Sequence, residues 1–340
     1  DGIRDQPRSR GLGDVYKRQE LTKKSVRHYL KVFLSDDNVV DLPKFLQQLI
    51  LRLFILPFRP KNTLEAYEKI WTAEGSPLII STDKIAKKLS SKTGWNVEYA
   101  MRYEEPSIEK ALTNFKNKDI KRIYVVSLYP HNAMATTVTT ELETLAVANR
   151  IANDFELTFV KPFYNNENYI NAVSNTINPH LESDSYDKIV FSYHGIPRRQ
   201  AKKTDETGEH CFSTNSCCEV ENDGSKDCYR SHTRIASSLT AEKLGLKEDQ
   251  WEVAYQSRLG PGWLTPFTDK RLAELPTEGK DNIAILCPSF ISDCLETLEE
   301  IDIRGRETFF NAGGKKMTYI PCLNDSEETI KLLEELVRSS

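Results

Sequence analysis

The chain is poor in several residue types whose abundance would point to a class of protein. Its 340 residues include 3 methionines, 6 histidines and 7 cysteines, and the formal net charge is −4. Nucleic-acid-binding surfaces are usually strongly basic, so this charge gives no support for nucleic acid as a partner. The N-terminus also lacks the apolar core of a secretory signal peptide. We therefore expect an intracellular protein with reduced thiols, and interpret its cysteines as metal ligands or core residues before disulfides.

Long apolar runs are also missing. The longest one, FLQQLILRLFILPF at 45–58, is interrupted by Gln47, Gln48 and Arg52. It is too short and too polar to cross a bilayer, which takes about 20 mostly apolar residues. We expect a buried helix here, and the alternative is an interfacial helix that touches a membrane surface.

The first residues lack any regular pattern. Residues 1–19, DGIRDQPRSRGLGDVYKRQ, show neither a helical nor a strand period, whereas an amphipathic helical pattern begins at Thr22. The stretch resembles translated adaptor sequence, so we expect a non-native leader. The alternative is a disordered native tail.

What the chain does contain is a regular alternation of helical and strand patterns. In the first half, strands are expected at 77–81, 96–103, 122–129 and 157–163, between helices at 22–34, 42–56, 63–71, 107–115 and 140–152. In the second half, strands are expected at 188–194, 251–258, 282–290 and 317–323, with helices at 168–182, 229–243, 293–309 and 326–338. This alternation predicts parallel sheets with helices on both faces. The length fits two units of about 150 residues each.

Polar residues directly after the strands are the candidates for chemistry, because ligands of open parallel sheets bind beyond the carboxyl ends of the strands. His194 ends a predicted strand, and Gly195 after it allows a ligand or backbone to come close. This histidine could accept a proton or bind a divalent metal ion, or it could be a hydrogen-bonded core residue.

Asp293, Glu296 and Glu300 fall on nearly one face of a predicted helix. They could lead cations or protons to a site, or form a solvated helix face.

A short polar segment holds most of the cysteines. HCFSTNSCCEVENDGSKDC, at 210–228, contains four of the seven: Cys211, Cys217, Cys218 and Cys228. Four thiolates are the usual ligands of a [2Fe–2S] centre or a structural zinc ion. The irregular spacing lacks paired C-x2-C knuckles and favours an iron–sulfur site over zinc, and four free thiols are the third alternative. The flanking His210 and His232 could replace a cysteine as ligand.

Several long motifs together closely resemble ferrochelatases, the enzymes that insert ferrous iron into a porphyrin to make haem. In the second half they are SYHGIP (192–197), YQSRLGPGWLTPFTD (255–269), CPSFISDCLETLEEID (287–302) and AGGKKMTYIPCLN (312–324). In the first half they are LPFRPKNTLEAYEKIWTAEGSPL (56–78), the Arg-Tyr of AMRYEEP and SLYPHNAMATTVTT (127–140). The resemblance runs from about Lys23 to the C-terminus.

The resemblance implies a fold and a set of site residues. The fold is α/β, with two Rossmann-like chelatase-type domains at 20–165 and 166–324, each a parallel four-stranded sheet flanked by helices. The porphyrin lies in the cleft between them, and the C-terminal helix at 325–340 packs back on the first domain. His194 and Glu296 correspond to the catalytic, iron-binding pair, and Glu300 and Asp293 to a metal or proton path on a helix with a π-type turn. The implied porphyrin contacts are Arg102, Tyr103, Tyr129, Trp263 and Ser76.

The resemblance also bears on cofactors and partners. The cysteine-rich insert at 205–228 resembles the internal insertion of some bacterial ferrochelatases that carries a [2Fe–2S] cluster, and zinc is the alternative. Turnover needs no redox cofactor. Porphyrin and ferrous iron are the implied partners, with weak membrane-surface contact and contact with neighbouring haem-pathway enzymes left open. The implied location is cytoplasmic, or peripheral to the inner face of the membrane.

One departure from the family pattern and two alternative functions remain. The family opens with an apolar strand and a glycine-containing loop that reaches the porphyrin, and the suspected leader stands in that position. If it is foreign, the chain lacks a strand and one wall of its site. A chelatase for coproporphyrin or another tetrapyrrole is one alternative function, and a non-catalytic haem or iron–sulfur sensor is the other. The presence of both His194 and Glu296 favours an enzyme.

Overall fold

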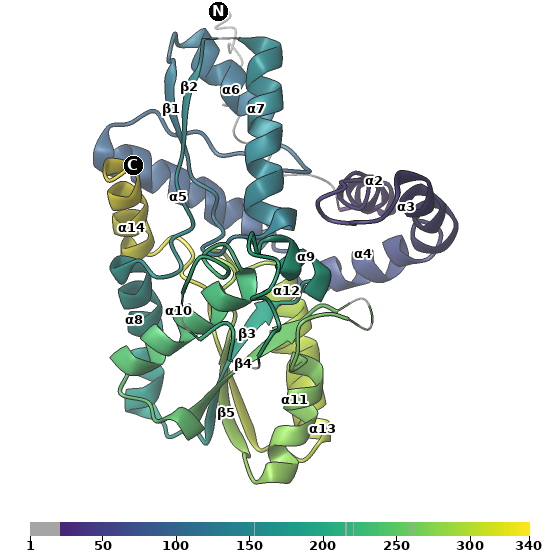
Figure 1. Ribbon diagram of the computed structural model, residues 1–340, viewed down its shortest axis with the longest axis vertical. Helices are drawn as coiled ribbons and strands as arrows, with labels where there is room; N and C mark the ends of the chain where they lie inside the picture. The colour runs from purple at the N-terminus through teal and green to yellow at the C-terminus, as the bar shows by residue number, and fades with distance from the viewer. Residues whose placement is uncertain (1–20, 153, 215, 220, 259, 261) are drawn as a thin grey trace, which may run out of the picture.

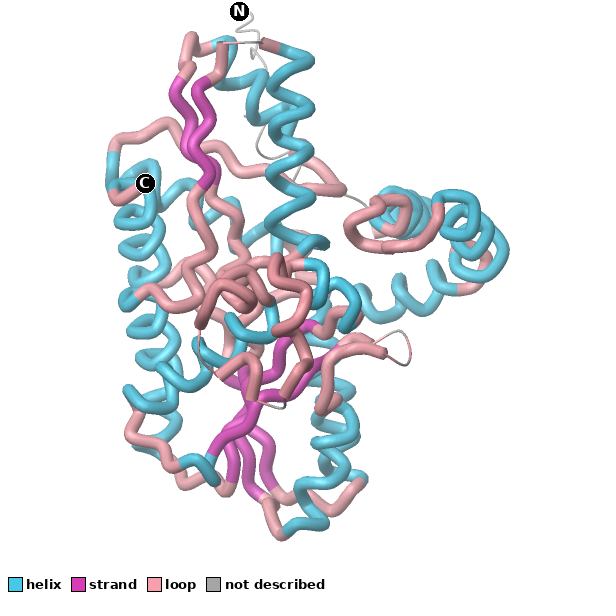
Figure 2. The backbone as a smooth tube through the Cα atoms, viewed as in Figure 1, coloured by secondary structure: helices cyan, strands magenta, loops and turns pink. Residues whose placement is uncertain are grey.

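Two parallel sheets with flanking helices form the body of the molecule, and an arm of helices projects from its side (Figure 1). The computed structural model describes residues 21–152, 154–214, 216–219, 221–258, 260 and 262–340. The suspected leader at 1–19 lies outside the described residues. Figure 2 shows the strands of the two sheets as separate groups, which confirms the predicted α/β class with parallel sheets. The domain limits at 20–165 and 166–324 stay a prediction.

The larger sheet has four parallel strands in the order β4-β3-β5-β6. They are β3 (Lys188–His194), β4 (Trp251–Gln256), β5 (Asn282–Leu286) and β6 (Lys316–Ile320), close to the predicted ranges. Neighbouring residues of β3 face opposite layers, since Val190 packs in one core cluster and Phe191 in another. The two layers are α8 (Glu167–Ser183) with α10 (Tyr229–Lys243), and α11 (Thr268–Glu274) with α13 (Arg306–Asn311).

The smaller sheet has two strands among the described residues, where four were predicted. These are β1 (Arg122–Val125) and β2 (Glu156–Phe159), which are parallel. The strand predicted at 77–81 is wrong, because this segment begins α5 (Pro77–Thr93), whose first-position proline has a backbone angle suited to a helix start. The segment predicted at 96–103 forms only an isolated bridge between Met101 and Ser107. Helices α6 (Ile108–Asn117) and α7 (Thr139–Ile151) pack beside this sheet.

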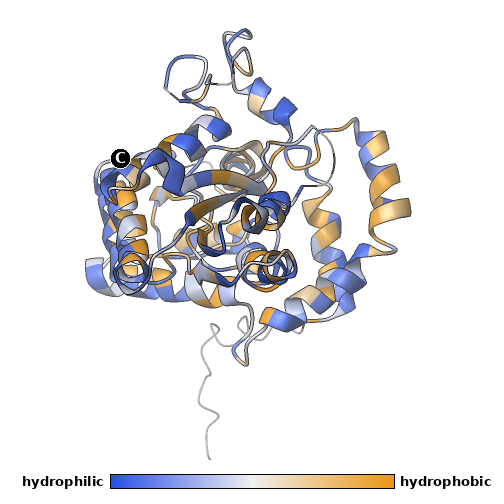
Figure 3. Cartoon of the chain, turned by 90° about the horizontal axis from the view of Figure 1, so that it is seen from below, coloured by the Kyte–Doolittle hydropathy of each residue, from blue (hydrophilic) through white to orange (hydrophobic). Residues whose placement is uncertain are grey.

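The arm consists of α2 (Lys23–Phe33), α3 (Lys44–Ile50), the π-helix η1 (Leu51–Ile55) and α4 (Arg59–Ile70). Its inner side forms a small core of its own, which includes Val26, Leu30 and Leu51. Its outer side exposes large apolar residues, so the predicted burial of 45–58 is wrong for that side. They are Phe45 at 80%, Leu53 at 56%, Phe54 at 65% and Phe58 at 68% exposure. The helices at the right of Figure 3, which are this arm, carry many hydrophobic residues.

No helix among the described residues is both long enough and apolar enough to span a membrane.

The C-terminal helix joins the two halves of the chain. Helix α14 (Glu327–Arg338) packs against α5 of the first half and α8 of the second. Its Glu334 pairs with Lys92 of α5 at 3.0 Å, and Asp325 just before it pairs with Lys88 at 2.7 Å. These contacts fix the position of the first half relative to the larger sheet.

Candidate active site

The order of the strands places a crevice at one end of the larger sheet. The chain forms β4 on one side of β3 and later returns to form β5 on the other side. Loops that leave adjacent strands in opposite directions open a crevice at their carboxyl ends, where α/β sheets bind ligands. A cavity of about 1080 Å³ lies there, which is large beside the roughly 300–1,000 Å³ typical of ligand pockets. His194 at the end of β3 and Glu296 after β5 both line it.

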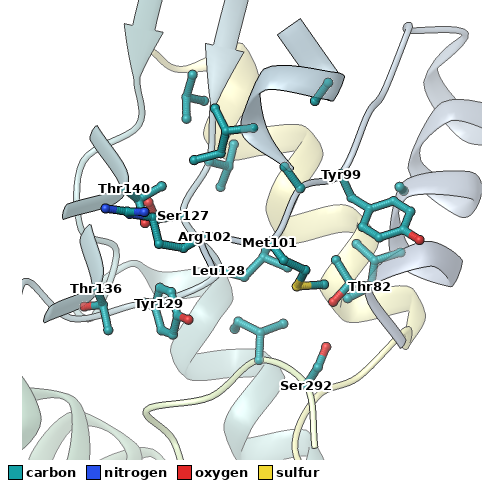
Figure 4. A pocket seen from close by; sticks show the side chains of 18 of the residues that line it. Thr82, Tyr99, Met101, Arg102, Ser127, Leu128, Tyr129, Thr136, Thr140 and Ser292 are labelled. Carbon is teal, nitrogen blue, oxygen red and sulfur yellow. The ribbon is translucent and has the colours of Figure 1, made fainter. Parts of the chain in front are cut away.

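The first half of the chain supplies the opposite wall. Figure 4 shows Tyr129 and Thr82 lining the cavity with Ser292, which comes from the loop after β5. The predicted contact Ser76, at the start of α5, is also part of the wall. The cavity continues beside β1 between α5 and α6, where apolar residues line it. The cavity therefore has a polar end at His194 and Glu296 and an apolar end beside β1. This combination suits a flat apolar ligand with a reactive centre.

His194 is held in one tautomer by its own neighbour. Its Nδ1 lies 2.7 Å from the carbonyl oxygen of Gly195. Because a carbonyl only accepts, Nδ1 carries the proton and Nε2 keeps its lone pair. Within the described part of the chain, Nε2 has no hydrogen-bond partner. The ring can therefore accept a proton or bind a metal ion from the cavity that it lines.

The close approach expected at Gly195 is present. A Cβ at this position would lie 2.8 Å from the carbonyl oxygen of Gln256 and 3.3 Å from Cε3 of Trp263. The Gly195 N–H also donates to that carbonyl at 2.8 Å. Trp263 thus packs behind the end of β3, and it is not part of the cavity wall that the described residues form.

Glu296 and Glu300 lie on consecutive helical segments after β5. Helix α12 (Leu295–Thr297) passes directly into the π-helix η5 (Leu298–Gly305), which is the π-type turn that the resemblance implied. Glu300 accepts hydrogen bonds from the backbone N–H of Ser257 at 2.8 Å and from its hydroxyl. Ser257 follows β4 with a left-handed φ of 61°, a conformation that these two bonds hold in place.

The environment of Glu300 favours its protonated form. Burial is the main cause that raises its pKa, and the negative charge of Glu296 raises it further. The hydrogen bonds from Ser257 and the nearby His194 act in the opposite direction and do not cancel the rise. A carboxyl with a raised pKa next to a histidine can take up and pass on protons.

Asp293 is placed differently from the predicted helix face. The helix begins only at Leu295, so Asp293 lies in the loop before it. Its carboxylate accepts from the hydroxyls of Tyr319 and Thr297 and from the side-chain amide of Asn324. It is not part of the cavity wall among the described residues, because these bonds turn it toward β6. The structure thus uses Asp293 to hold the loop after β5.

Three tyrosines line the cavity and are influenced by the charge of Glu296, and two of them were not found from the sequence. Burial, with the charges of Cys294 and Glu296, raises the pKa of Tyr129 to about 12. Burial and the charge of Glu296 also raise the pKa of Tyr29 and of Tyr67 well above the usual value. Tyr29 and Tyr67 come from α2 and α4, so the arm forms one side of the site. No local motif marks them, since they reach the site only through the packing of the arm.

The predicted porphyrin contacts Arg102 and Tyr103 line the cavity but already have a polar partner. The Arg102 guanidinium lies 2.8 Å from Asp36 Oδ2, and the Tyr103 hydroxyl donates to the same oxygen at 3.0 Å. Thr139 of α7 donates to it as well. Burial raises the pKa of Asp36, but the hydrogen bonds and Arg102 outweigh it and lower the pKa. Asp36 therefore stays ionised and links the arm to the domain part that contains Arg102, Tyr103 and Thr139.

The four predicted cluster cysteines lie near one another in a loop whose described residues form neither helix nor strand. The sulfur atoms of Cys217 and Cys218 are 3.5 Å apart, and the thiols of Cys218 and Cys228 form a hydrogen bond. Cys211 lies close enough for both Cys217 and Cys228 to raise its pKa, although burial is the larger cause. Cys217, Cys218 and Cys228 are buried.

The surroundings of these thiols suit bound thiolates. Arg230 Nη1 lies 3.6 Å and 3.5 Å from the sulfurs of Cys217 and Cys218, and a backbone N–H donates to Cys217 at 3.4 Å. The hydrogen bond from Cys218 is the main cause that lowers the pKa of Cys228 to about 6. Donors and a cation around the sulfurs are the surroundings that anionic metal–thiolate centres need.

The cysteine loop has suitable ligand residues for a metal centre, but their side chains are not arranged around a common point. In the described part of the chain, no three His, Cys, Asp or Glu side chains are arranged as a metal site. A metal centre would thus require the cysteine side chains to turn toward a common point. The two flanking histidines are engaged elsewhere, with His210 Nε2 at 2.6 Å from the Cys217 carbonyl and His232 Nε2 at 2.7 Å from the Lys226 carbonyl.

Known proteins resemble the chain over almost its whole length. A family model described as Ferrochelatase matches residues 19–340. The chain is 40% identical over 314 residues to the ferrochelatase of Pseudomonas fluorescens (strain Pf0-1), and the match covers 92% of each chain. It is 39% identical over 318 residues to that of Opitutus terrae (strain DSM 11246 / JCM 15787 / PB90-1), again with 92% of each covered. The sirohydrochlorin chelatase SirB of Bacillus subtilis subspecies spizizenii, solved in complex with cobalt, has a similar fold, with a TM-score of 0.52 and 13% identity over 79% of this chain and 91% of that one.

Proposed function

This chain belongs to the ferrochelatase family and inserts iron into a porphyrin in haem biosynthesis, and we propose that its substrates are ferrous iron and protoporphyrin IX. The enzyme is a lyase. The observation that carries the proposed mechanism is the fixed tautomer of His194, whose free Nε2 belongs to the same cavity wall as Glu296.

His194 acts as the base in this mechanism. A porphyrin binds iron only after its two pyrrole N–H groups lose their protons, so a proton acceptor is needed near the ring centre. Nε2 of His194 has the lone pair for this step, because Nδ1 donates to the Gly195 carbonyl. A well-placed general base accelerates a reaction by roughly 10²–10⁴-fold.

Glu296 receives the iron, and His194 can bind it as well only while its Nε2 holds no proton. A carboxylate and a neutral imidazole are suitable ligands for ferrous iron. The neighbouring hydroxyls of Tyr29, Tyr67 and Tyr129 have raised pKa values, so they stay protonated at neutral pH. Glu296 is therefore the group near these tyrosines that can supply negative charge to the entering cation.

Glu300 carries the released protons away. Its pKa is raised, chiefly by burial. A positive charge on His194 acts in the opposite direction and lowers it. Ser257 holds its carboxylate in place with two hydrogen bonds. A proton taken up by His194 can pass to this carboxylate and from there to solvent. Asp293 is left out of the path because its oxygens bind Tyr319, Thr297 and Asn324.

We further propose that Cys211, Cys217, Cys218 and Cys228 hold a [2Fe–2S] cluster. The proximity of the four thiols and the position of Arg230 support this proposal. When bound, such a cluster would supply structural cross-linking and sensitivity to oxidation, and iron insertion itself involves no electron transfer. The iron and acid-labile sulfide content of the purified protein tests it. Zinc without sulfide would show that the alternative is correct.

The exposed side of the arm suggests a place for the enzyme in the cell. Phe45, Leu53, Phe54 and Phe58 are exposed together, and Arg52 and Arg59 beside them are exposed cations. This combination is typical of helices that rest on an anionic lipid surface. We propose a cytoplasmic enzyme that touches the inner face of the membrane through this side. Sedimentation with anionic vesicles should decrease for Phe54→Ser combined with Phe58→Ser.

Product identification tests the substrate assignment. The protein is incubated with ferrous iron and either protoporphyrin IX or coproporphyrin without oxygen, and the product is identified by absorbance and mass. We expect faster metallation of protoporphyrin IX. Faster metallation of coproporphyrin would overturn the assignment, and tight haem binding without any metallation would favour a sensor.

A further inference from the structure

Two hydroxyl groups outside the proposed catalytic pair hold the backbone of His194. Ser289 Oγ accepts from the His194 N–H at 3.2 Å, and the Tyr229 hydroxyl donates to the His194 carbonyl at 2.9 Å. The two hydroxyl oxygens are 3.0 Å apart. A backbone N–H only donates and a carbonyl only accepts. Only one set of directions is therefore possible. The His194 N–H donates to Ser289, the Ser289 hydroxyl donates to Tyr229, and the Tyr229 hydroxyl donates to the His194 carbonyl, so the bonds form a closed ring.

This ring is buried. Tyr229 and Ser289 are each 6% exposed. Bonds in such a closed chain polarise and strengthen one another. Removal of either hydroxyl leaves a buried polar group of His194 without its partner.

The same turn of α10 that carries Tyr229 belongs to the cysteine loop. Cys228, the residue before Tyr229, is the N-cap of α10 and hydrogen-bonds Cys218. Arg230, the residue after it, lies against the sulfurs of Cys217 and Cys218. Of these three consecutive residues, Cys228 and Arg230 contact the cysteine sulfurs, and Tyr229 between them contacts the backbone of His194. A change at the sulfurs must shift the first turn of α10 and with it the Tyr229 hydroxyl.

We propose that Tyr229 is a positioning residue that fixes His194 for iron insertion and transmits the state of the cysteine loop to it. The inference rests on the proposed function, in which His194 is the base and the loop holds a cluster. It gives the loop a role in the reaction, although the loop cysteines belong to a separate cluster of side chains. Disturbance of the loop lowers the rate through the displacement of His194.

The first experiment removes one hydroxyl at a time. Tyr229→Phe and Ser289→Ala each open the ring, and Ser289→Ala decides the question if Tyr229→Phe does not fold. We expect kcat per porphyrin-binding site to fall about tenfold, as the loss of one buried hydrogen bond can produce, and KM for porphyrin to change by less than about twofold. Counting the binding sites by porphyrin titration separates this effect from unfolding, which lowers the number of sites but not the rate per site.

Tyr255→Phe is the matched control. Tyr255 is also a buried tyrosine packed on α10, but its hydroxyl bonds Thr233 at 2.9 Å instead of His194. We expect its kcat per site to stay within about twofold of the wild type. If Tyr229→Phe and Ser289→Ala behave like Tyr255→Phe, the positioning role is wrong.

The second experiment tests the link to the loop. Cys218→Ser should lower kcat per site several-fold, and its combination with Tyr229→Phe should lower it no further than Tyr229→Phe alone, because both act through one contact. Losses that multiply in the double variant would overturn the link. Removal of the cluster from wild type and Tyr229→Phe by a chelator gives the same comparison if Cys218→Ser does not fold.

The outcomes also separate this inference from the proposed function. If His194→Ala keeps full activity, the proposed role of His194 fails. If His194→Ala is inactive while Tyr229→Phe equals the wild type, only the inference fails. If the protein contains no sulfide, the cluster proposal is wrong. Tyr229→Phe and Ser289→Ala then still decide whether Tyr229 positions His194.

Discussion

The proposed reaction centre consists of His194, Glu296 and Glu300, and it meets the cysteine loop, residues 205–228, at the first turn of α10. The two regions are built differently. His194 ends a strand whose residues 189–193 are buried, and the two glutamates lie on helical segments that directly follow the loop after β5. The described residues of the cysteine loop form neither helix nor strand. Side chains on regular elements keep their positions without a ligand, whereas side chains on a loop depend on local bonds or on the bound group.

The bonds that hold the two regions differ in the same way. Groups at the ends of the strands hold the reaction centre, as the side-chain amide of Gln256 shows by donating to the Glu296 carbonyl at 2.7 Å. A single carboxylate, Asp205, organises much of the cysteine loop. We therefore expect substitutions in the reaction centre to lower the rate strongly and leave the proposed cofactor, and substitutions in the loop to affect the cofactor with a much smaller loss of rate.

The largest effect is expected for His194→Ala. Without the base, kcat should fall by about 10³-fold, within the range for general base catalysis. Porphyrin affinity, measured by fluorescence quenching, should stay within about threefold, and iron–sulfur absorption should be unchanged. A variant that loses porphyrin binding and keeps its rate per bound porphyrin would contradict the role as base and would make His194 a binding residue.

Glu300→Gln should have a smaller effect on the rate and a measurable effect on pH dependence. The raised pKa of Glu300 means that wild-type activity should fall as the pH decreases through that value, because the relay needs the ionised carboxylate. The glutamine variant should lose about tenfold in kcat at pH 7 and lack this acid limb. Profiles of kcat against pH for both proteins give the comparison, and an unchanged acid limb would assign it to another group.

The same substitution should stabilise the protein. A carboxyl whose pKa is raised on folding contributes stability below its unfolded pKa of about 4.3, and this stability is lost as the pH rises through the folded pKa. At pH 7 this stability is reduced, so Glu300→Gln should raise the melting temperature. Near pH 4 the two proteins should melt alike. A lower melting temperature at pH 7 would show that the Ser257 hydrogen bonds outweigh the burial.

The sequence predicted the larger sheet and the residues at its strand ends well, for a physical reason. Buried parallel strands are short apolar runs with polar residues after them, so His194 and Gly195 were visible as a strand end. The strand predicted at 77–81 failed because PLIIS has strand-like composition, while Ser76 and the following proline begin a helix there. Local composition could not decide between the two.

The remaining parts of the site depend on contacts between distant segments. Tyr29 and Tyr67 reach Glu296 only because the arm folds back, and Asp36 meets Arg102 across 66 positions of the chain. Asp293 was expected on a helix face, but the start of the helix at Leu295 leaves it in a loop with other partners. A sequence pattern shows which residues share an element, and it does not show which elements meet.

In the cysteine loop, Cys218→Ser should remove the proposed cofactor without abolishing iron insertion. The serine hydroxyl is a poor substitute for a thiolate ligand, so visible iron–sulfur absorption and bound sulfide should disappear. We expect a several-fold loss of kcat per porphyrin-binding site, far smaller than for His194→Ala. The matched control is Cys322→Ser, outside the loop, which should keep the absorption. Equal loss of absorption in both variants would mean that the loop cysteines do not hold the cluster.

The smallest effect is expected for Asp205→Asn, which weakens the loop without touching a sulfur. Asp205 accepts from the hydroxyl and N–H of Thr207 and from the N–H groups of His210 and Cys211. These bonds, with the Thr207 hydroxyl as the largest cause, lower the pKa of Asp205 to about 2. Their contribution is present above the unfolded pKa of about 3.9 and is lost as the pH falls toward 2. The loop should therefore open on acidification before the larger sheet unfolds.

At pH 7 the asparagine variant lacks the charge that strengthens these hydrogen bonds, and its cluster should be lost to a chelator a few times faster than that of the wild type. Asp223→Asn is the matched control, because Asp223 lies in the same loop with an exposed side chain. It should retain the cluster as long as the wild type does. The rate per porphyrin-binding site should stay within about twofold in both variants, since neither removes the Tyr229 hydroxyl. If Asp205→Asn and Asp223→Asn lose the cluster equally fast, the loop is held by the metal centre itself, and the contrast with the reaction centre becomes sharper.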